Sequence, residues 1–186
     1  MSIFISSDFH YGHTNICGPK VSSWGSGYRD FDSVKEMNEA IVGSVNANVK
    51  RSDTLYFLGD WSFGGKDNVW KLREQLVVEN IIFIRGNHDK SIDEYKHLFK
   101  SISNFIETYI NNKMFVMCHY ALRVWNKSHR GSLHCYGHSH HSLPEIGKSM
   151  DVGWCKYRRP LDIEEVIEIL SKRDILTVDH HKGNME

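Results

Sequence analysis

The chain has little proline, no long apolar run and no excess of charge of one sign. Three prolines in 186 residues, without any low-complexity segment, argue against a linker that would divide the chain. No stretch of about 18 consecutive apolar residues occurs, so a transmembrane helix is excluded and we expect a soluble protein. Lys and Arg number 23, as do Asp and Glu, and this balance excludes a general positive field for long nucleic acids.

Cysteine is also scarce, and no two cysteines form a C-x-x-C pair. The four are widely separated and lie in or beside apolar segments: Cys17, Cys118, Cys135 and Cys155. A chain of this length can bury an adequate core without covalent crosslinks. We therefore expect free thiols in a reducing compartment, which indicates a cytoplasmic location, and we disfavour a disulfide framework.

Apolar strands and helical patterns alternate through the first half of the chain. Residues 3–7, 55–58 and 81–84 are short apolar runs typical of buried strands. Between them, Ser33 and Glu36 form a capping box that predicts the start of a helix, and residues 69–78 predict a second helix. This alternation predicts an α/β domain that collects ligands at the carboxyl ends of its strands.

The second half of the chain predicts shorter strands and a closing helix. We expect strands at residues 105–110, 114–118, 133–136 and 149–152, in a second sheet, and a helix over 161–170 with Pro160 near its start. One domain over residues 1–178 follows from the chain length. Residues 179–186 are polar and predict a loose tail.

The chain contains five polar clusters, and most of them directly follow an apolar run. They are Asp8-Phe9-His10, Gly59-Asp60, Gly86-Asn87-His88-Asp89, Cys118-His119 and Gly137-His138-Ser139-His140. Together they supply enough Asp, Asn and His side chains to hold two metal ions and leave one histidine for proton transfer. Alternate residues of an extended segment share a face, so we expect Asp8 and His10 to converge, and likewise His138 and His140.

In this order, the five clusters resemble the motif blocks of the calcineurin-like metallophosphoesterase superfamily. The resemblance implies an α/β fold in which two facing mixed sheets are flanked by helices, an αββα sandwich. It also implies two sets of metal ligands: Asp8, His10, Asp60 and His140 for the first ion, and Asp60, Asn87, His119 and His138 for the second. In this arrangement Asp60 bridges both ions, because a carboxylate has two oxygens and a charge that offsets two cations.

The same resemblance implies direct attack on phosphorus by a metal-bridging hydroxide, with His88 as the acid that protonates the leaving group. Asp89 beside it is expected to orient the His88 ring. The mixed nitrogen and oxygen ligands suit manganese first, with iron, zinc, cobalt or nickel as alternatives.

Segments outside the ligands resemble a subgroup of small phosphoesterases found in bacteria and phages. In that subgroup an extra His and Asn follow the first ligand pair, matched here by His13 and Asn15, which are expected to touch substrate or the surroundings of the first metal. Arg85 either reaches a phosphate oxygen or is a surface charge. The stretch from Gly59 to Gly65 lacks the Asp and Arg of protein phosphatases of this superfamily, which disfavours that activity.

The predicted function is hydrolysis of a small phosphorylated substrate. A phosphodiester, cyclic or derived from a nucleotide, is favoured over a phosphomonoester. A nuclease is disfavoured by the balanced charge. A non-catalytic metal-binding scaffold is disfavoured because His88 and every ligand role are filled. The sequence leaves the native metal, the physiological substrate and the oligomeric state open.

Overall fold

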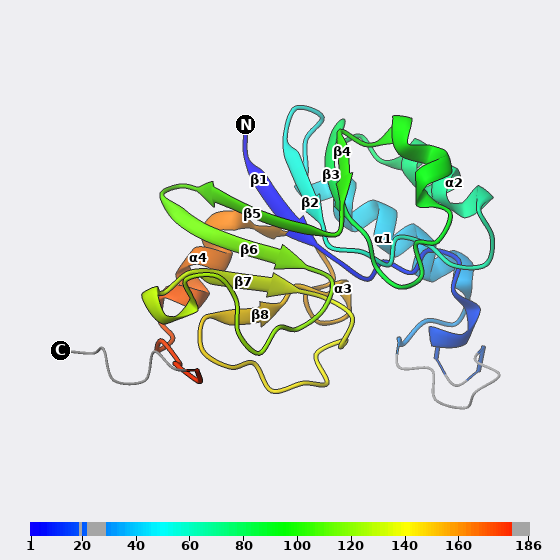
Figure 1. Cartoon of the computed structure of the whole chain (residues 1–186). Helices are drawn as coiled ribbons and strands as arrows, with labels where there is room; N and C mark the ends of the chain where they lie inside the picture. Colours follow the sequence, from blue (N-terminus) through cyan, green and yellow to red (C-terminus); the bar gives the residue numbers. More distant parts are fainter. Residues whose placement is uncertain (19, 22–28, 180–186) are drawn as a thin grey trace.

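The computed structural model describes residues 1–18, 20–21 and 29–179, and contains two mixed β-sheets flanked by helices (Figure 1). The first sheet has the order β4 (Ser101–Ser103), β3 (Asn80–Ile84), β2 (Thr54–Phe57), β1 (Ile3–Ser6), β9 (Leu161–Asp162). The second has the order β5 (Phe105–Ile110), β6 (Lys113–Cys118), β7 (Leu133–Tyr136), β8 (Ser149–Asp151). This architecture confirms the predicted fold class.

Parallel pairing places the polar clusters at one edge of each sheet. Strands β1, β2, β3 and β4 run parallel, while β9 pairs antiparallel with β1. In the second sheet β5 and β6 form an antiparallel pair, and β6, β7 and β8 run parallel. Because the carboxyl ends of parallel strands lie at the same edge, the clusters that follow them are brought close together.

The helices α1 (Val34–Asn48) and α2 (Asp67–Gln75) pack with the first sheet around one hydrophobic core. Ser33 caps α1 as predicted, because its hydroxyl accepts the N–H of Glu36 at 3.1 Å. The Glu36 carboxylate accepts the N–H of Asp32, one residue before the predicted partner. The predicted helix over residues 69–78 is wrong at its end: Leu76 is extended, and the buried side chains of Leu76 and Val78 lead the chain into β3.

A second hydrophobic core lies between the two sheets and includes the closing helix. Ile5 and Ile84 of the first sheet share it with Phe115 and Met150 of the second. The helix α4 (Ile163–Ser171) buries Val166 and Leu170 in the same core and lies beside the second sheet (Figure 1).

The predicted helix over residues 161–170 is wrong at its start, because α4 begins two residues later, at Ile163. Leu161 and Asp162 form β9 instead, because they pair with Ile5 and Phe4. The Asp162 carboxylate then caps α4 by accepting the N–H of Glu164 at 2.9 Å.

Four short elements were not predicted from the sequence. They are the 3₁₀ helices η1 (Thr14–Ile16), η2 (Ile92–Leu98) and η3 (Ser128–Arg130), and the helix α3 (Trp154–Tyr157). Strand β4 was also missed, since its three residues form too short a run to show a period.

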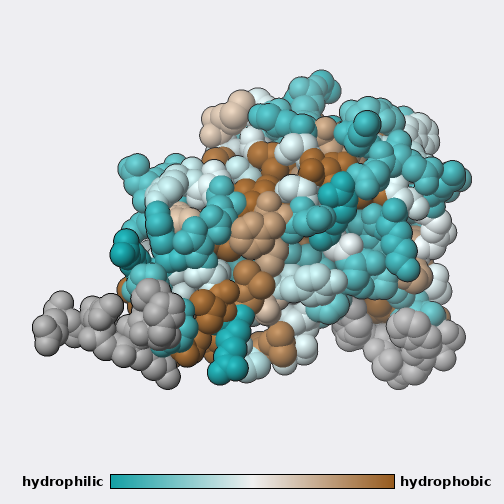
Figure 2. Space-filling view, in the orientation of Figure 1, coloured by the Kyte–Doolittle hydropathy of each residue, from teal (hydrophilic) through white to brown (hydrophobic). Residues whose placement is uncertain are grey.

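The surface of the second sheet is partly hydrophobic. On the face shown in Figure 2, hydrophobic residues form a band across the middle of the molecule, between hydrophilic areas. The edge strand β5 alternates in burial, so Phe105 and Tyr109 are exposed while Ile110 is buried. In the part of the chain that the structure describes, no helix is both long and apolar enough to cross a bilayer.

All four cysteines carry free thiols, and Cys155 is the least buried of them. Apart from Asp179, the predicted tail of residues 179–186 lies outside the described residues.

Candidate metal centre

The loops that follow β1, β2, β6 and β7 are joined by backbone hydrogen bonds. The N–H groups of Asp8 and His10 donate to the carbonyls of Gly59 and Asp60, each at 2.9 Å. On the other side, the Gly137 N–H donates to the carbonyl of His119 at 3.0 Å. Backbone hydrogen bonds alone therefore align four of the predicted clusters.

Most of the predicted ligands have left-handed backbone conformations. The φ angles of Asp8, His10, Asp60, His138 and His140 are 57°, 50°, 60°, 66° and 47°. The expected extended geometry is therefore wrong, and the convergence of each pair comes from tight turns after the strands end. Non-glycine residues seldom adopt this region, and Asp, Asn and His tolerate it best, so backbone strain is concentrated at this site.

Two glycines allow the β2 and β3 loops to approach each other. A Cβ atom at Gly86 would lie 2.2 Å from Oδ1 of Asp60, and one at Gly59 would lie 2.5 Å from the nitrogen of Gly86. Gly59 also has a φ of +93°, which favours glycine. Glycine is thus required at both positions for the Asp60 side chain to reach its place.

The first group of candidate ligands consists of Asp8, His10 and His140. Nε2 of His10 lies 3.3 Å from Nε2 of His140 and 3.6 Å from Oδ1 of Asp8. Nε2 of His140 lies 3.8 Å from the same Asp8 oxygen. Ligand atoms about 2.1 Å from one ion are separated from each other by about 3.0–3.4 Å at tetrahedral or octahedral angles. The distance between the two histidine nitrogens lies in this range, and those to Asp8 exceed it by 0.2 and 0.4 Å, so small side-chain movements would let the three atoms hold one cation.

The second group consists of Asp60, His119 and His138, and Asn87 lies among them. Oδ1 of Asn87 is 3.0 Å from Nε2 of His119 and 2.9 Å from Nδ1 of His138. Nε2 of His119 is 3.4 Å from Oδ2 of Asp60. Two imidazole nitrogens, an amide oxygen and a carboxylate oxygen form a donor set suited to a transition-metal ion.

Asp60 connects the two groups. Its Oδ2 is 3.5 Å from Nε2 of His10 and 3.4 Å from Nε2 of His119, while its Oδ1 accepts the N–H of His88 at 2.9 Å. The same carboxylate oxygen therefore faces one histidine from each group. This is the arrangement that a ligand shared by two ions requires.

The electrostatics of the site favour positive charge between the carboxylates. Burial opposes protonation of His119, but the Asp60 carboxylate raises the pKa of His119 to about 9. Burial also works against ionisation of Asp8, yet hydrogen bonding and charge from His10 hold the pKa of Asp8 well below its ordinary value. Nδ1 of His119 bonds to the carbonyl of Leu58 at 2.8 Å, which leaves Nε2 to face Asp60.

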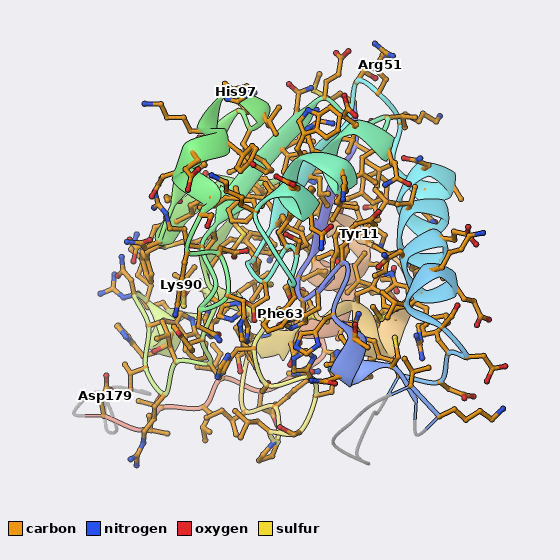
Figure 3. All side chains as sticks on the ribbon, turned by 90° about the vertical axis from the view of Figure 1, so that its right-hand side faces the viewer. Tyr11, Arg51, Phe63, Lys90, His97 and Asp179 are labelled. Atoms are coloured by element: carbon orange, nitrogen blue, oxygen red, sulfur yellow. The ribbon has the colours of Figure 1, made fainter. Side chains whose placement is uncertain are left out.

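His88 is exposed at the edge of the metal groups. Its ring lies 5.4 Å from that of His10 and 5.2 Å from that of Phe63, measured between centroids. With Phe63 and Lys90 it lines a cavity of about 230 Å³. Figure 3 shows Phe63 and Lys90 on neighbouring loops in the lower half of the view.

The expected orientation of His88 by Asp89 is wrong. Oδ2 of Asp89 accepts the N–H groups of Asp60 and Gly86, each at 2.7 Å, and Oδ1 accepts that of Trp61 at 2.9 Å. Among the described residues, Asp89 makes no hydrogen bond to the His88 ring. Both oxygens of this buried carboxylate hold the β2 and β3 loops together instead.

The three predicted substrate contacts have different surroundings. His13 is buried and its ring stacks on Phe63 at 3.8 Å, near the ring of His10, while Asn15 lies in η1 beyond the first ligand turn. Arg85 forms an ion pair with Asp93 and a hydrogen bond to Asn104, so its guanidinium serves as a surface charge in this structure.

Two residues beside this site are not among those predicted from the sequence. Arg29 is fully buried and donates to the carbonyls of Asp8 and Phe9, and no periodicity marked it. Asp151, at the end of β8, also lies at this site and accepts the hydroxyl of Ser139 and the N–H of His141. It therefore supports the turn that carries His138 and His140.

Comparisons with known proteins agree with this geometry. A family model described as calcineurin-like phosphoesterase matches residues 1–185. The chain belongs to the calcineurin-like phosphoesterase family. Membership makes it a phosphoester hydrolase of a family that uses divalent metal ions, and the structure holds two candidate groups for them.

One sequence relative and two solved structures are similar to this chain. An uncharacterized protein of Methanocaldococcus jannaschii is 27% identical over 176 residues, which cover 94% of each chain. A solved structure of a protein of unknown function from Aquifex aeolicus has a TM-score of 0.69 and 20% identity, over 90% of this chain and 98% of that one. An archaeal phosphodiesterase is more distant, with a TM-score of 0.47 and 20% identity over 84% and 87% of the two chains.

Proposed function

We propose that this calcineurin-like phosphoesterase hydrolyses a small phosphorylated substrate with two divalent metal ions, and that a phosphodiester is preferred. The observation that carries the proposal is Oδ2 of Asp60, which lies within 3.5 Å of a histidine nitrogen from each ligand group. When bound, the two ions supply charge that activates water and stabilises the phosphoryl oxygens. The donor set suits manganese first, with iron, zinc, cobalt or nickel as alternatives.

His88 is proposed as the general acid. Its backbone N–H bonds to Asp60, which fixes the residue beside the ligand that serves both groups. In the described part of the chain, its imidazole has ring neighbours but no hydrogen-bond partner, so a ring nitrogen can face a leaving oxygen. Proton donation from such a position contributes about 10²–10⁴-fold to the rate.

Two cavities beside the metal groups support a diester substrate. The cavity of about 230 Å³ contains His88, and a second of about 830 Å³ is lined by His138 and His140, one from each ligand group. A phosphodiester carries an organic group on each of two ester oxygens, and these cavities offer room for both. The ring of Tyr120, half exposed and 4.8 Å from that of His138, offers a surface on which a nucleobase can stack.

A phosphomonoester is the second candidate. Lys66 and Lys90 line the smaller cavity, and their charges favour the extra negative charge of a monoester. Lys66 is paired with Glu94 at 3.2 Å, so Lys90 supplies most of this effect. We place the protein in the cytoplasm because all four of its thiols are free.

The test compares two substrates on the manganese-loaded protein. Bis(4-nitrophenyl) phosphate is expected to be hydrolysed with a higher kcat/KM than 4-nitrophenyl phosphate. The reverse order would establish the monoesterase. Bound metal in elemental analysis without hydrolysis of either ester would favour a binding scaffold. A panel of phosphorylated metabolites that includes 2',3'-cyclic nucleotides would then identify the substrate.

A further inference from the structure

A buried arginine and a cysteine lie directly behind the first group of metal ligands. Nη1 of Arg29 donates to the carbonyl of Phe9 at 2.6 Å, and Nη2 donates to the carbonyl of Asp8. The guanidinium also directs Nε and Nη2 at Sγ of Cys155, at 3.4 and 3.2 Å. Arg29 thus joins the Asp8–His10 turn to α3, an element more than one hundred residues later in the chain.

Cys155 also contacts His140, a residue of the first ligand group. Its Sγ is 3.2 Å from Nδ1 of His140, while Nε2 of the same ring faces Asp8 and His10. A neutral imidazole that offers Nε2 to a metal carries its proton on Nδ1, which must then donate. The Arg29 guanidinium has only donors, and Nδ1 of His140 donates in this tautomer. Sγ of Cys155 therefore accepts from both Arg29 and His140.

The environment of Arg29 is consistent with a positioning role. Its side chain is fully buried, and among the described residues no carboxylate lies within ion-pair distance of it. Its charge is accommodated by two carbonyls, the sulfurs of Cys155 and Met37, and the ring of Trp154, whose centroid is 5.3 Å from the guanidinium carbon. A lysine could not replace this arrangement, because a single ammonium lacks the planar fork that reaches carbonyls and sulfur together.

The position of Cys155 is itself fixed from two sides. The N–H of Trp154 donates to the carbonyl of Ser7 at 3.0 Å, which ties α3 to the end of β1. The indole N–H of Trp154 donates to the hydroxyl of Ser44 in α1 at 2.9 Å. The sulfur is therefore held at a set distance from the first ligand turn, and the His140 ring is oriented against it.

We propose that Arg29 and Cys155 are positioning residues that fix the ring of His140 and the Asp8–His10 turn, and so set the affinity of the first metal site. The proposal rests on the proposed function only in that the first group binds a metal ion. Cys155 also lines the cavity of about 830 Å³, and the role proposed for it here is its contact with Arg29 and His140. Partners behind a ligand histidine typically change metal affinity about 10–100-fold when they are removed.

The experiment measures metal binding rather than hydrolysis. Isothermal titration of the full chain with Mn²⁺ is expected to resolve two ions, and Cys155→Ala is expected to weaken one of them about 10–100-fold. Cys155→Ser keeps an acceptor and is expected to recover part of the loss. Cys135→Ala removes a fully buried thiol from the core between the sheets and serves as the matched control. It is expected to lower the Tm without changing either affinity.

A second measurement reads the His140 ring directly. In long-range ¹H–¹⁵N spectra of the zinc-loaded protein, Nδ1 of His140 is expected to be protonated, with slow proton exchange in the parent and faster exchange in Cys155→Ala. Unchanged affinities and unchanged exchange in Cys155→Ala would overturn the proposal. A parent protein that binds no metal at all would instead overturn the proposed function.

Discussion

The carboxylate of Asp89 accepts the backbone N–H of Asp60 at 2.7 Å, so one buried acid fixes the position of another. Burial raises the pKa of Asp89, and the nearby charge of Asp60 adds to the effect. Three N–H donors that point at the Asp89 oxygens offset this by favouring the ionised form. The sharing of Asp60 between the two ligand groups therefore depends on a residue that is not itself in either group.

Replacement of Asp89 by Asn is expected to destabilise the fold and weaken binding of both ions. The amide group of Asn would present an N–H₂ to a backbone N–H, and one buried donor would lose its acceptor. This loss lowers the free energy of unfolding by about 1–3 kcal/mol, measured by urea denaturation. Asp93→Asn, which removes an exposed carboxylate paired with Arg85, is the control and should change stability by less than about 1 kcal/mol. Equal stability of the two variants would contradict the assigned role.

Asp60 and Asp8 are expected to differ in how many ions their removal releases. Oδ2 of Asp60 faces histidine nitrogens of both groups. Asp8 faces the imidazoles of His10 and His140 in the first group, and from the second group it contacts the backbone N–H of His138. Asp60→Ala should therefore lose both ions, and Asp8→Ala mainly the first. Metal content by elemental analysis, after loading with Mn²⁺ and dialysis, checks this difference. Two ions retained in Asp60→Ala would show that the carboxylate is not shared.

The effect of His88→Ala is expected to depend on the leaving group. A basic alkoxide needs a proton as it departs, whereas 4-nitrophenolate leaves readily without one. The variant should lose about 10²–10⁴-fold in kcat for an alkyl ester and much less for bis(4-nitrophenyl) phosphate. His97→Ala, at an exposed position in η2, is the matched control. The same loss with both esters would remove His88 from the role of acid.

Alanine at two glycines is expected to have opposite effects on stability. A Cβ at Gly86 would clash with the Asp60 side chain at 2.2 Å, so Gly86→Ala should lower the Tm and weaken metal binding. At Gly43, in the middle of α1, a Cβ meets nothing within 4 Å. Gly43→Ala should therefore stabilise the protein by about 0.5–1 kcal/mol, because alanine loses less backbone entropy in a helix. Thermal unfolding of both variants checks the contrast.

His134 is expected to make stability fall in mild acid. Burial lowers the pKa of His134 from 6.5 to about 4. Nε2 accepts the N–H of Leu122 at 3.0 Å and Nδ1 donates to the carbonyl of Val116 at 2.9 Å, so the folded state needs the neutral ring. Between these two pKa values the unfolded chain binds a proton that the folded chain does not. The free energy of unfolding therefore decreases as the pH falls from 6.5 to about 4, by about 3 kcal/mol from this residue.

Urea denaturation across that pH range measures the slope, and His134→Gln should reduce it. His97→Gln replaces an exposed histidine and should leave the slope as it is in the parent. A slope unaffected by His134→Gln would mean that other groups cause the acid sensitivity.

The positions of the main strands could be predicted from local patterns, whereas the two sets of candidate ligands were implied by the resemblance to a known family. Apolar runs mark β1, β2 and β3 because both faces of these strands are buried, and the polar clusters follow where the strands end. The shortest elements could not be predicted from the sequence. β9 has two residues and exists only because it pairs with β1, so the sequence of Leu161 and Asp162 alone favours the helix that follows.

Side-chain roles that depend on distant contacts could not be predicted. Asp89 is next to His88 in the sequence, but its oxygens bond to N–H groups of a loop 28 and 29 residues earlier. Arg29 and Cys155 are separated by 126 residues and carry no local pattern. Only the folded chain shows what these side chains contact.

The sequence by itself determined which chemical groups are present and that they follow strand ends, because burial and backbone periodicity are local properties of the chain. Tertiary structure decided how those groups meet. The left-handed turns at Asp8, Asp60 and His138, and the convergence on Oδ2 of Asp60, arise in loops held together by backbone hydrogen bonds within each sheet. Two side chains add bonds between the sheets: the Asp8 carboxylate accepts the N–H of His138, and Nδ1 of His119 bonds to the carbonyl of Leu58. Such bonds join residues far apart in the chain, so their geometry is set by packing and cannot be read from neighbouring residues.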